Sequence, residues 1–389
     1  MSAELVPRRI LPAIVLSQLA GATLWFAINA VMPELSRETG LAPSAIGVLT
    51  SSVNAGFIAG TLVFALLTVA DRFSPRRVFL LCAFAGAGCN AAAVLAASSF
   101  ELLLALRFAT GFFLAGIYPV GMKIASGWYT RGLGAALGFL VGALVLGTAA
   151  PHGLHALLDE SLPWQGVMVS TSVIAAAGGL LMFVLVPDGP YLARTDRIDP
   201  AALRVIWTDR KVRASAFGYF GHMWELYAVW VLAPMIVARR FDAADVPAAA
   251  FAMIGLGCIG CAAGGVIAQR IGSARVAAIQ LAASGVCCLL APLMFDAPLA
   301  LFAVWLAVWG TTVVGDSPQF SALSANNSPR EFVGSVLTFV NCIGFAISIV
   351  SIQFLVWLLE RLPLEIALPW LAIGPAVGLR MLRPLLRSG

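Results

Sequence analysis

Charged side chains are scarce in this sequence, and their scarcity excludes most classes of soluble protein. Asp, Glu, Lys and Arg together make up 11% of the 389 residues. A soluble protein carries roughly 25% charged residues. Hydrophobic residues make up 60% of the chain, which is more apolar surface than a soluble domain can bury. The composition therefore predicts a polytopic membrane protein.

Three further absences narrow the function. The formal charge is only +5 and the arginines lie in loops between apolar segments, so no nucleic-acid partner is expected. The sequence has no glycine-rich loop with a Walker lysine, so we expect neither ATP as an energy source nor another cofactor. All seven cysteines lie inside apolar runs, where a thiol behaves as a small hydrophobe, so no disulfide framework is indicated.

Long apolar runs fill most of the chain. Each has about the 20 residues that an α-helix needs to cross about 30 Å of hydrocarbon. The runs are continuous rather than alternating, which indicates membrane helices and not barrel strands. The predicted fold class is therefore an all-α polytopic membrane protein with twelve transmembrane helices. The runs are 10–33, 44–69, 77–97, 100–124, 132–152, 164–186, 214–238, 247–269, 275–295, 298–321, 332–357 and 364–383.

Lysine and arginine are distributed unevenly over the loops. With the N-terminus placed in the cytoplasm, nineteen of them fall on the cytoplasmic side and four on the opposite side. This bias predicts that both termini are cytoplasmic. Arg8 and Arg9 precede the first run and no small-residue cleavage site follows it, so we expect this run to stay as a helix and not to be removed as a signal peptide.

The longest polar segment, 187–213, lies between the sixth and seventh runs. It predicts a cytoplasmic linker between two six-helix bundles, residues 1–186 and 214–389. A short amphipathic helix around 200–207 would lie on the membrane surface. A solvated loop explains the composition of this segment equally well.

The two predicted halves share short sequence patterns. The basic turn 67–78 has a counterpart at 265–276, in which the arginines fall 198 residues later. Gly116-Ile-Tyr-Pro119 in the fourth run likewise matches Gly315-Asp-Ser-Pro318 in the tenth. These matches indicate that the chain contains two copies of one repeated unit. The matched turn residues are Asp71, Arg72, Arg76 and Arg77 in the first copy and Arg270 and Arg275 in the second.

The first basic turn resembles the loop pattern G-x-x-x-D-R-x-G-R-R, which marks the major facilitator superfamily. Leu67 replaces the first glycine and Ser74-Pro75 replaces Gly-x, while Gln269 replaces the aspartate in the second copy. When the pattern of apolar runs is considered together with this motif, the resemblance covers nearly the whole chain. The members it resembles are bacterial. It implies a secondary transporter of the inner membrane, made of two pseudo-symmetric six-helix bundles with the substrate site between them.

The resemblance also implies a role for the basic turn in gating. The aspartate of this loop is thought to lie near the N-terminus of the eleventh helix, here around 332–334. A carboxylate at a helix N-terminus is stabilising. Asp71 and the arginines of both turns would then hold the cytoplasmic side shut.

Ionisable side chains inside the runs are the first candidates for a functional site, because a charge in hydrocarbon costs at least ~2.5–3.5 kcal/mol. His222 and Glu225 are three residues apart and share a face of the seventh run with Tyr219. We predict that Glu225 binds a proton or a cationic group and that His222 tunes it. A buried polar pair that locks two helices is the alternative.

Arg107 and Asp316 are two further candidates for proton or substrate binding. Arg107 resembles the superfamily's R-x-x-x-G pattern, in which the arginine is linked to proton coupling or anion binding, and pairing with backbone carbonyls is the alternative. Asp316 lies between Gly315 and Pro318, and proline loosens a helix. We therefore predict a gate or a proton site there, with a pair to Arg330 as the alternative.

Neutral polar and aromatic side chains in the runs could hydrogen-bond a substrate or merely hold helices together. Asn54, Asn341 and Tyr118 join Tyr219 as substrate-binding candidates.

Two observations bear on particular substrates. Cys258, Cys261 and nearby Met253 would suit Cu(I), so a copper-like importer of the same fold is an alternative function. The stretch 255–265 is rich in small residues, which is ordinary for close helix packing, so no metal site is predicted. The fifth run lacks the Gly-Pro dipeptide typical of the family's drug/proton antiporters, which weighs against multidrug export.

The sequence thus predicts a secondary active transporter of a small solute, proton-coupled, monomeric and embedded in the lipid bilayer. An enzyme would need a clustered catalytic set at one interface, which the sequence lacks, so no catalytic residue is predicted. A receptor or scaffold would normally carry a soluble domain, and the longest loop has fewer than thirty residues. The sequence determines neither the solute nor the choice between symport, antiport and uniport.

Overall fold

Helices lying side by side make up nearly the whole molecule. The structure, a computed structural model, describes residues 6–129, 133–158, 163–192 and 198–387. No strand occurs among them, and eleven helices in this part of the chain are long and apolar enough to cross a membrane. The all-α polytopic fold predicted from the apolar runs is confirmed.

Helix boundaries follow the predicted runs to within a few residues in most cases. The helices are α1 (Ile10–Ala22), α2 (Ala27–Ala30), α3 (Met32–Thr39), α4 (Ala45–Leu66), α5 (Val69–Arg72), α6 (Pro75–Leu95), α7 (Phe100–Leu114), α8 (Tyr118–Trp128), α9 (Leu133–Leu158), α10 (Trp164–Leu185), α11 (Ala201–Thr208), α12 (Arg210–Val237), α13 (Val246–Gly255), α14 (Gly257–Ile271), α15 (Ser273–Met294), α16 (Leu299–Gly315), α17 (Ser317–Asn327), α18 (Val333–Leu359), α19 (Leu364–Ala367) and α20 (Ile373–Leu386), with short 3-10 segments at Arg330–Phe332 and Leu368–Ala372.

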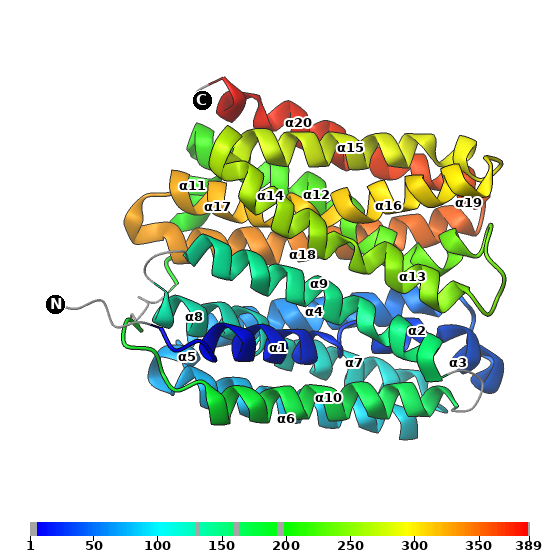
Figure 1. Cartoon of the computed structure of the whole chain (residues 1–389), viewed down its shortest axis with the longest axis horizontal. Helices are drawn as coiled ribbons and strands as arrows, with labels where there is room; N and C mark the ends of the chain where they lie inside the picture. The colour runs from blue at the N-terminus through cyan, green and yellow to red at the C-terminus, as the bar shows by residue number, and fades with distance from the viewer. Residues whose placement is uncertain (1–5, 130–132, 159–162, 193–197, 388–389) are drawn as a thin grey trace.

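The helices form two bundles that meet along two seams. In the first bundle, α1 packs against α9 and α10, and α4 against α7; in the second, α12 packs against α18 and α20. Between the bundles, α4 packs against α18, and α9 packs against α13 and α14. In Figure 1 the first bundle lies below the second. The exact division at 187–213 stays a prediction, and residues 193–197 of that linker lie outside the described residues.

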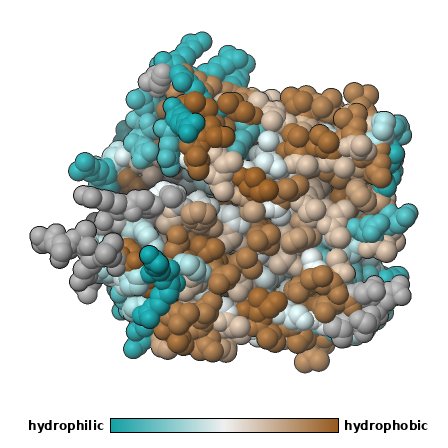
Figure 2. Space-filling view, in the orientation of Figure 1, coloured by the Kyte–Doolittle hydropathy of each residue, from teal (hydrophilic) through white to brown (hydrophobic). Residues whose placement is uncertain are grey.

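The two ends of the molecule differ from its middle. The start of α1, the end of α20 and α11 lie at the same end, on the left in Figure 1, which we call the linker end; the opposite end is the far end. Figure 2 shows a broad apolar band between two hydrophilic ends, as a bilayer requires. α11 occupies the position of the expected amphipathic helix, burying Ala202 and Ile206 and exposing Trp207.

The first run, predicted as one helix over 10–33, is interrupted, and that prediction is wrong. α1 ends at Ala22, and the next three backbone N–H groups bond to carbonyls only three residues back. The Thr23 Oγ1 lies 2.7 Å from the Ala20 carbonyl oxygen and 3.1 Å from the Thr171 carbonyl oxygen of α10, so its single O–H is shared between these two acceptors. Such side-chain bonds compete with the helical ladder. The interruption leaves the carbonyls of Leu24 and Trp25 available to side-chain donors.

Thr68, in the first basic turn, adopts a strained backbone conformation. Its φ is +47°, and it is the one non-glycine residue with positive φ in the described part of the chain. This left-handed conformation costs an L-residue roughly 1–2 kcal/mol.

We expect Thr68→Gly to raise the free energy of unfolding by about 1 kcal/mol, because glycine adopts positive φ without strain. The melting temperature of the purified protein should rise. Ala70→Gly, inside α5, is the control and should lower it. A melting temperature that falls in Thr68→Gly would contradict this account of the turn.

Candidate functional site

A cavity of about 200 Å³ lies between the two bundles, towards the linker end. Helices α4 and α8 of the first bundle and α12, α17 and α18 of the second contribute its walls. Three predicted substrate-binding residues, Tyr118, Tyr219 and Asn341, line it, and the Tyr219 hydroxyl donates to Asn341 Oδ1 at 2.9 Å. The described residues that line it are Thr61, Tyr118, Pro119, Met122, Tyr219, Ser317, Phe320, Ser321, Ser324, Leu337, Thr338, Val340 and Asn341.

Two helix breaks border this cavity, at the repeated Gly-x-x-Pro patterns. The chain leaves the α-helix between α7 and α8 before Pro119, and between α16 and α17 before Pro318. Because proline has no N–H, Pro318 leaves the Val314 carbonyl without its usual helical partner. The Cys261 thiol donates to that carbonyl at 3.5 Å. This contact gives Cys261 a structural role.

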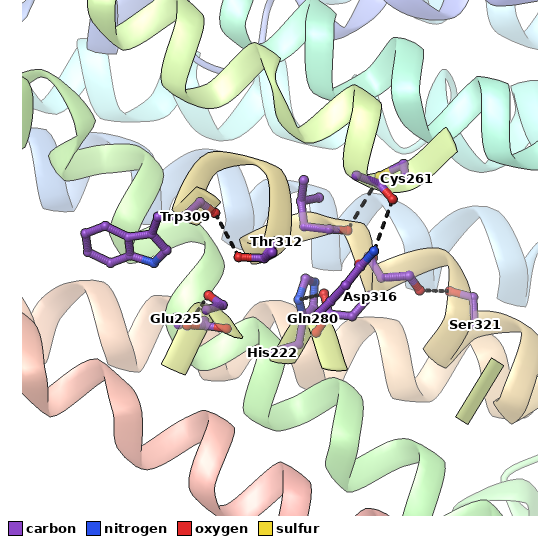
Figure 3. Close-up of polar contacts among 12 residues, drawn as sticks. His222, Glu225, Cys261, Gln280, Trp309, Thr312, Asp316 and Ser321 are labelled. Carbon is purple, nitrogen blue, oxygen red and sulfur yellow. Dashed lines mark hydrogen bonds and ion pairs between the residues drawn. The ribbon is translucent and has the colours of Figure 1, made fainter. Parts of the chain in front are cut away.

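His222 and Asp316 form a buried pair directly behind the cavity wall. His222 Nδ1 lies 2.8 Å from Asp316 Oδ1, and both side chains are fully buried. Figure 3 shows Asp316 facing His222 from the junction of α16 and α17. Asp316 immediately precedes the cavity residue Ser317, and the His222 ring centroid lies 5.7 Å from that of Tyr219 and 6.3 Å from that of Phe320. One layer of side chains therefore separates the pair from the cavity.

Glu225 has a separate environment on the same helix. Its Oε2 accepts hydrogen bonds from the Ser284 hydroxyl at 2.8 Å and the Cys288 thiol at 3.5 Å, both on α15. Its Oε1 has no hydrogen-bond partner among the described residues. The sequence suggested that His222 tunes Glu225, but His222 contacts Asp316 instead. Within the described part of the chain, no lysine or arginine forms an ion pair with either buried carboxyl group.

Arg107 is fully buried inside the first bundle, away from the cavity. Its guanidinium donates to Asn90 Oδ1 at 2.7 Å and to the carbonyls of Leu24 and Trp25 at 3.0 and 2.8 Å. Those carbonyls belong to the interruption after α1. Non-helical backbone is tolerated at membrane depth only where its polar groups are satisfied. The contacts therefore favour the structural interpretation of Arg107 over proton or anion binding.

We expect Arg107→Ala to lower the free energy of unfolding by at least ~3 kcal/mol, because each hydrogen bond to a charged group contributes about 1.5–3 kcal/mol. The free energy of unfolding of Arg107→Lys should lie between those of the unaltered protein and Arg107→Ala, because an ammonium group cannot reproduce the planar set of donors of a guanidinium. Thermal unfolding and membrane expression measure both. An Arg107→Ala protein with normal melting temperature but no transport would restore the functional interpretation.

The far half of the interface is closed by aromatic side chains. The Phe345 ring centroid lies 4.5 Å from that of Phe57 and 5.5 Å from that of Trp25, both in the first bundle. Asn54, predicted to bind substrate, lies here: its amide donates to Ser348 Oγ at 3.1 Å and its Oδ1 accepts from the Trp25 indole. We call Trp25, Phe26, Phe57, Tyr227, Trp230 and Phe345 the aromatic gate.

The predicted gating residues lie at the linker end. Asp71 pairs with Lys123 of α8, and Arg76 lies 4.0 Å from Asp188 and over the Phe183 ring, all in the first bundle or directly after it. The contact between Asp71 and residues 332–334 stays a prediction for a conformation with this end closed. The remaining members lie at helix ends: Arg72 in α5, Arg77 in α6, Arg270 in α14 and Arg275 in α15.

Several residues of the site were not identified from the sequence. Ser317 carried a signal, because it lies in the Gly315-x-x-Pro318 pattern. Thr61, Phe320 and most of the aromatic gate carried none, since single uncharged residues in an apolar run look like ordinary packing.

Comparison with known proteins agrees with this architecture. Residues 14–352 match the family model described as Major Facilitator Superfamily. A chloramphenicol resistance protein of Streptomyces lividans is 26% identical over 226 residues, which is 56% of this chain and 55% of that protein, so the match spans about half of that relative. The crystal structure of the human organic anion transporter MFSD10 (TETRAN) superposes with a TM-score of 0.73 at 14% identity, covering 96% of this chain and 99% of that one, which shows likeness of fold alone. Because the family model matches most of the chain, the protein belongs to the Major Facilitator Superfamily of membrane transporters.

Proposed function

We propose that this protein is a proton-coupled secondary transporter that moves a small solute by alternating access. The observation that carries the proposal is the cavity between the bundles with the buried His222–Asp316 pair directly behind its wall. Ionisable groups inside a membrane are expensive and mark ion or substrate pathways by default.

Asp316 is placed where a change of charge would alter the backbone. It lies at the break between α16 and α17, and Ser317 of the cavity follows it. A proton gained or lost by the pair changes its charge in a medium of low dielectric, where electrostatic interactions are strong. The position of α17 along the cavity would then depend on that proton. Among the described residues, the ionisable side chain shown in contact with Asp316 is His222.

The conformation fits one half of a transport cycle. The aromatic gate closes the far half, while the cavity lies towards the linker end. If the linker end is cytoplasmic, as the distribution of lysine and arginine predicts, the cavity faces the cytoplasm. The opposite conformation would open the aromatic gate and close the linker end.

Copper import, the alternative suggested by Cys258, Cys261 and Met253, stays a prediction. No group of three or more His, Cys, Asp or Glu side chains in the described part of the chain is arranged to hold a metal ion, and a Cys–Met site is not covered by that finding.

Proteoliposomes test the proposal. We expect a pH gradient to drive accumulation of the transported solute, to the alkaline side for symport or the acidic side for antiport, and an uncoupler to abolish it. Chloramphenicol belongs among the first solutes tested because of the relative from Streptomyces lividans. Flux that ignores the gradient would contradict proton coupling, and absence of flux for every solute of a broad panel would contradict transport.

A further inference from the structure

In the part of the chain that the structure describes, the cavity between the bundles is lined by uncharged residues. The thirteen described residues that line it are apolar, aromatic, hydroxyl-bearing or amide-bearing. The two buried carboxyl groups of the second bundle have other partners: Asp316 faces His222, and Glu225 accepts from Ser284 on α15. A charged solute in this cavity would therefore find no opposite charge among the described residues of its wall.

Burying an unpaired charge costs far more than burying a neutral polar group. A solute with a carboxylate or an ammonium would lose its hydration here without gaining an ion pair. A neutral solute with hydroxyl or amide groups loses less and can regain hydrogen bonds from the wall.

The cavity contains hydrogen-bonding capacity that the protein does not use itself. Thr61 is 7% exposed, and its Oγ1 has no hydrogen-bond partner in the described part of the chain. Leaving a buried hydroxyl of this kind unpaired is unfavourable, and a ligand that accepts from or donates to it could recover that cost. Asn341 accepts from Tyr219 through Oδ1, which leaves its two amide N–H groups to donate.

The same wall offers apolar contact. Met122 of the first bundle and Phe320 and Leu337 of the second line the cavity beside the polar groups. Thr61 on one bundle and Asn341 on the other would both reach a solute of suitable size, so binding would connect the bundles.

We infer that the solute is an uncharged molecule with an apolar or aromatic body and hydroxyl or amide groups, and not an organic anion or cation. This inference rests on the proposed function, because it takes this cavity as the solute site.

The test uses three probes with one skeleton and three charges: chloramphenicol (neutral), its succinate ester (anionic) and its deacylated amine (cationic), each within a set of size-matched aromatic compounds of the same charge. The readout is thermal stabilisation of the purified protein. A compound counts as a cavity ligand only if Asn341→Leu weakens it at least tenfold while Thr110→Val does not. Thr110 is a buried threonine of α7 whose hydroxyl donates within its own helix, so it is a matched control.

We expect the cavity ligands to be neutral, with Thr61→Val weakening them by about tenfold, which corresponds to 1.4 kcal/mol. Asn341→Asp places a carboxylate in the cavity, so this variant should bind compounds of the cationic set more tightly than those of the neutral set. A cavity ligand from the anionic or cationic set of the unaltered protein would overturn the inference, as would the absence of any cavity ligand in all three sets. Failure here is separate from failure of the proposed function, since pH-driven flux of a charged solute would uphold transport and reject the solute class.

Discussion

Asp316→Asn is expected to abolish pH-driven accumulation of the solute while leaving exchange of solute for solute intact. With one proton per solute, a gradient of two pH units supports about 100-fold accumulation, since each unit is worth 1.36 kcal/mol. Asparagine keeps the size of the carboxyl group but cannot release or take up a proton. Exchange without net proton movement needs only the cavity and the two conformations, so it should survive.

Proteoliposomes give both rates for the same preparation. Glu225→Gln is the companion measurement, because the sequence predicted that Glu225 binds a proton or a cationic group. His222→Ala should shift the pH profile of accumulation without erasing it. We expect the proton site to be Asp316 and not Glu225, because Asp316 adjoins the cavity whereas Glu225 contacts α15. If Asp316→Asn still accumulates solute and Glu225→Gln does not, the proton site is Glu225.

Phe345→Ala is expected to open the far half of the interface. Its ring contacts Trp25 and Phe57 across the bundles, and each aromatic pair contributes about 0.5–1.5 kcal/mol beyond the area it buries. Losing both pairs removes about 2 kcal/mol from this conformation alone, a shift in the conformational equilibrium of roughly 30-fold.

Labelling of single cysteines at the far end measures that shift as increased reactivity. Phe84→Ala is the control, because Phe84 is 51% exposed on α6 and forms no ring pair with a gate residue among the described residues. Equal labelling of the Phe345→Ala and Phe84→Ala proteins would show that the aromatic gate does not hold this end closed.

The sequence predicted the helices correctly because the bilayer restricts which secondary structures can span it. A chain in hydrocarbon must satisfy its backbone internally, so long apolar runs are helices wherever they occur. The loosened helix predicted at Pro318 agrees with the break between α16 and α17, whereas the break beside Pro119 was not predicted. The interruption after α1 was missed, because it depends on Thr23 bonding to Thr171, which is 148 residues away.

The partners of buried polar side chains were harder to predict. Helical periodicity showed that His222 and Glu225 share one side of α12, but it could not show which helix lies opposite each. The two residues contact different helices, His222 facing Asp316 and Glu225 facing Ser284. Arg107 was left between two interpretations for the same reason, since its carbonyl partners exist only because α1 is interrupted.

Alternating access is the central claim, and paired distance measurements on one protein test it most directly. One pair of genetically encoded spin labels at Ser126 and Asn326 reports on the linker end, and a second pair at Arg37 and Glu360 reports on the far end; all four positions are exposed. We predict that a change of pH or addition of solute shortens the first distance while lengthening the second. Distances that stay fixed under every condition, or that change at both ends in the same direction, would contradict the account.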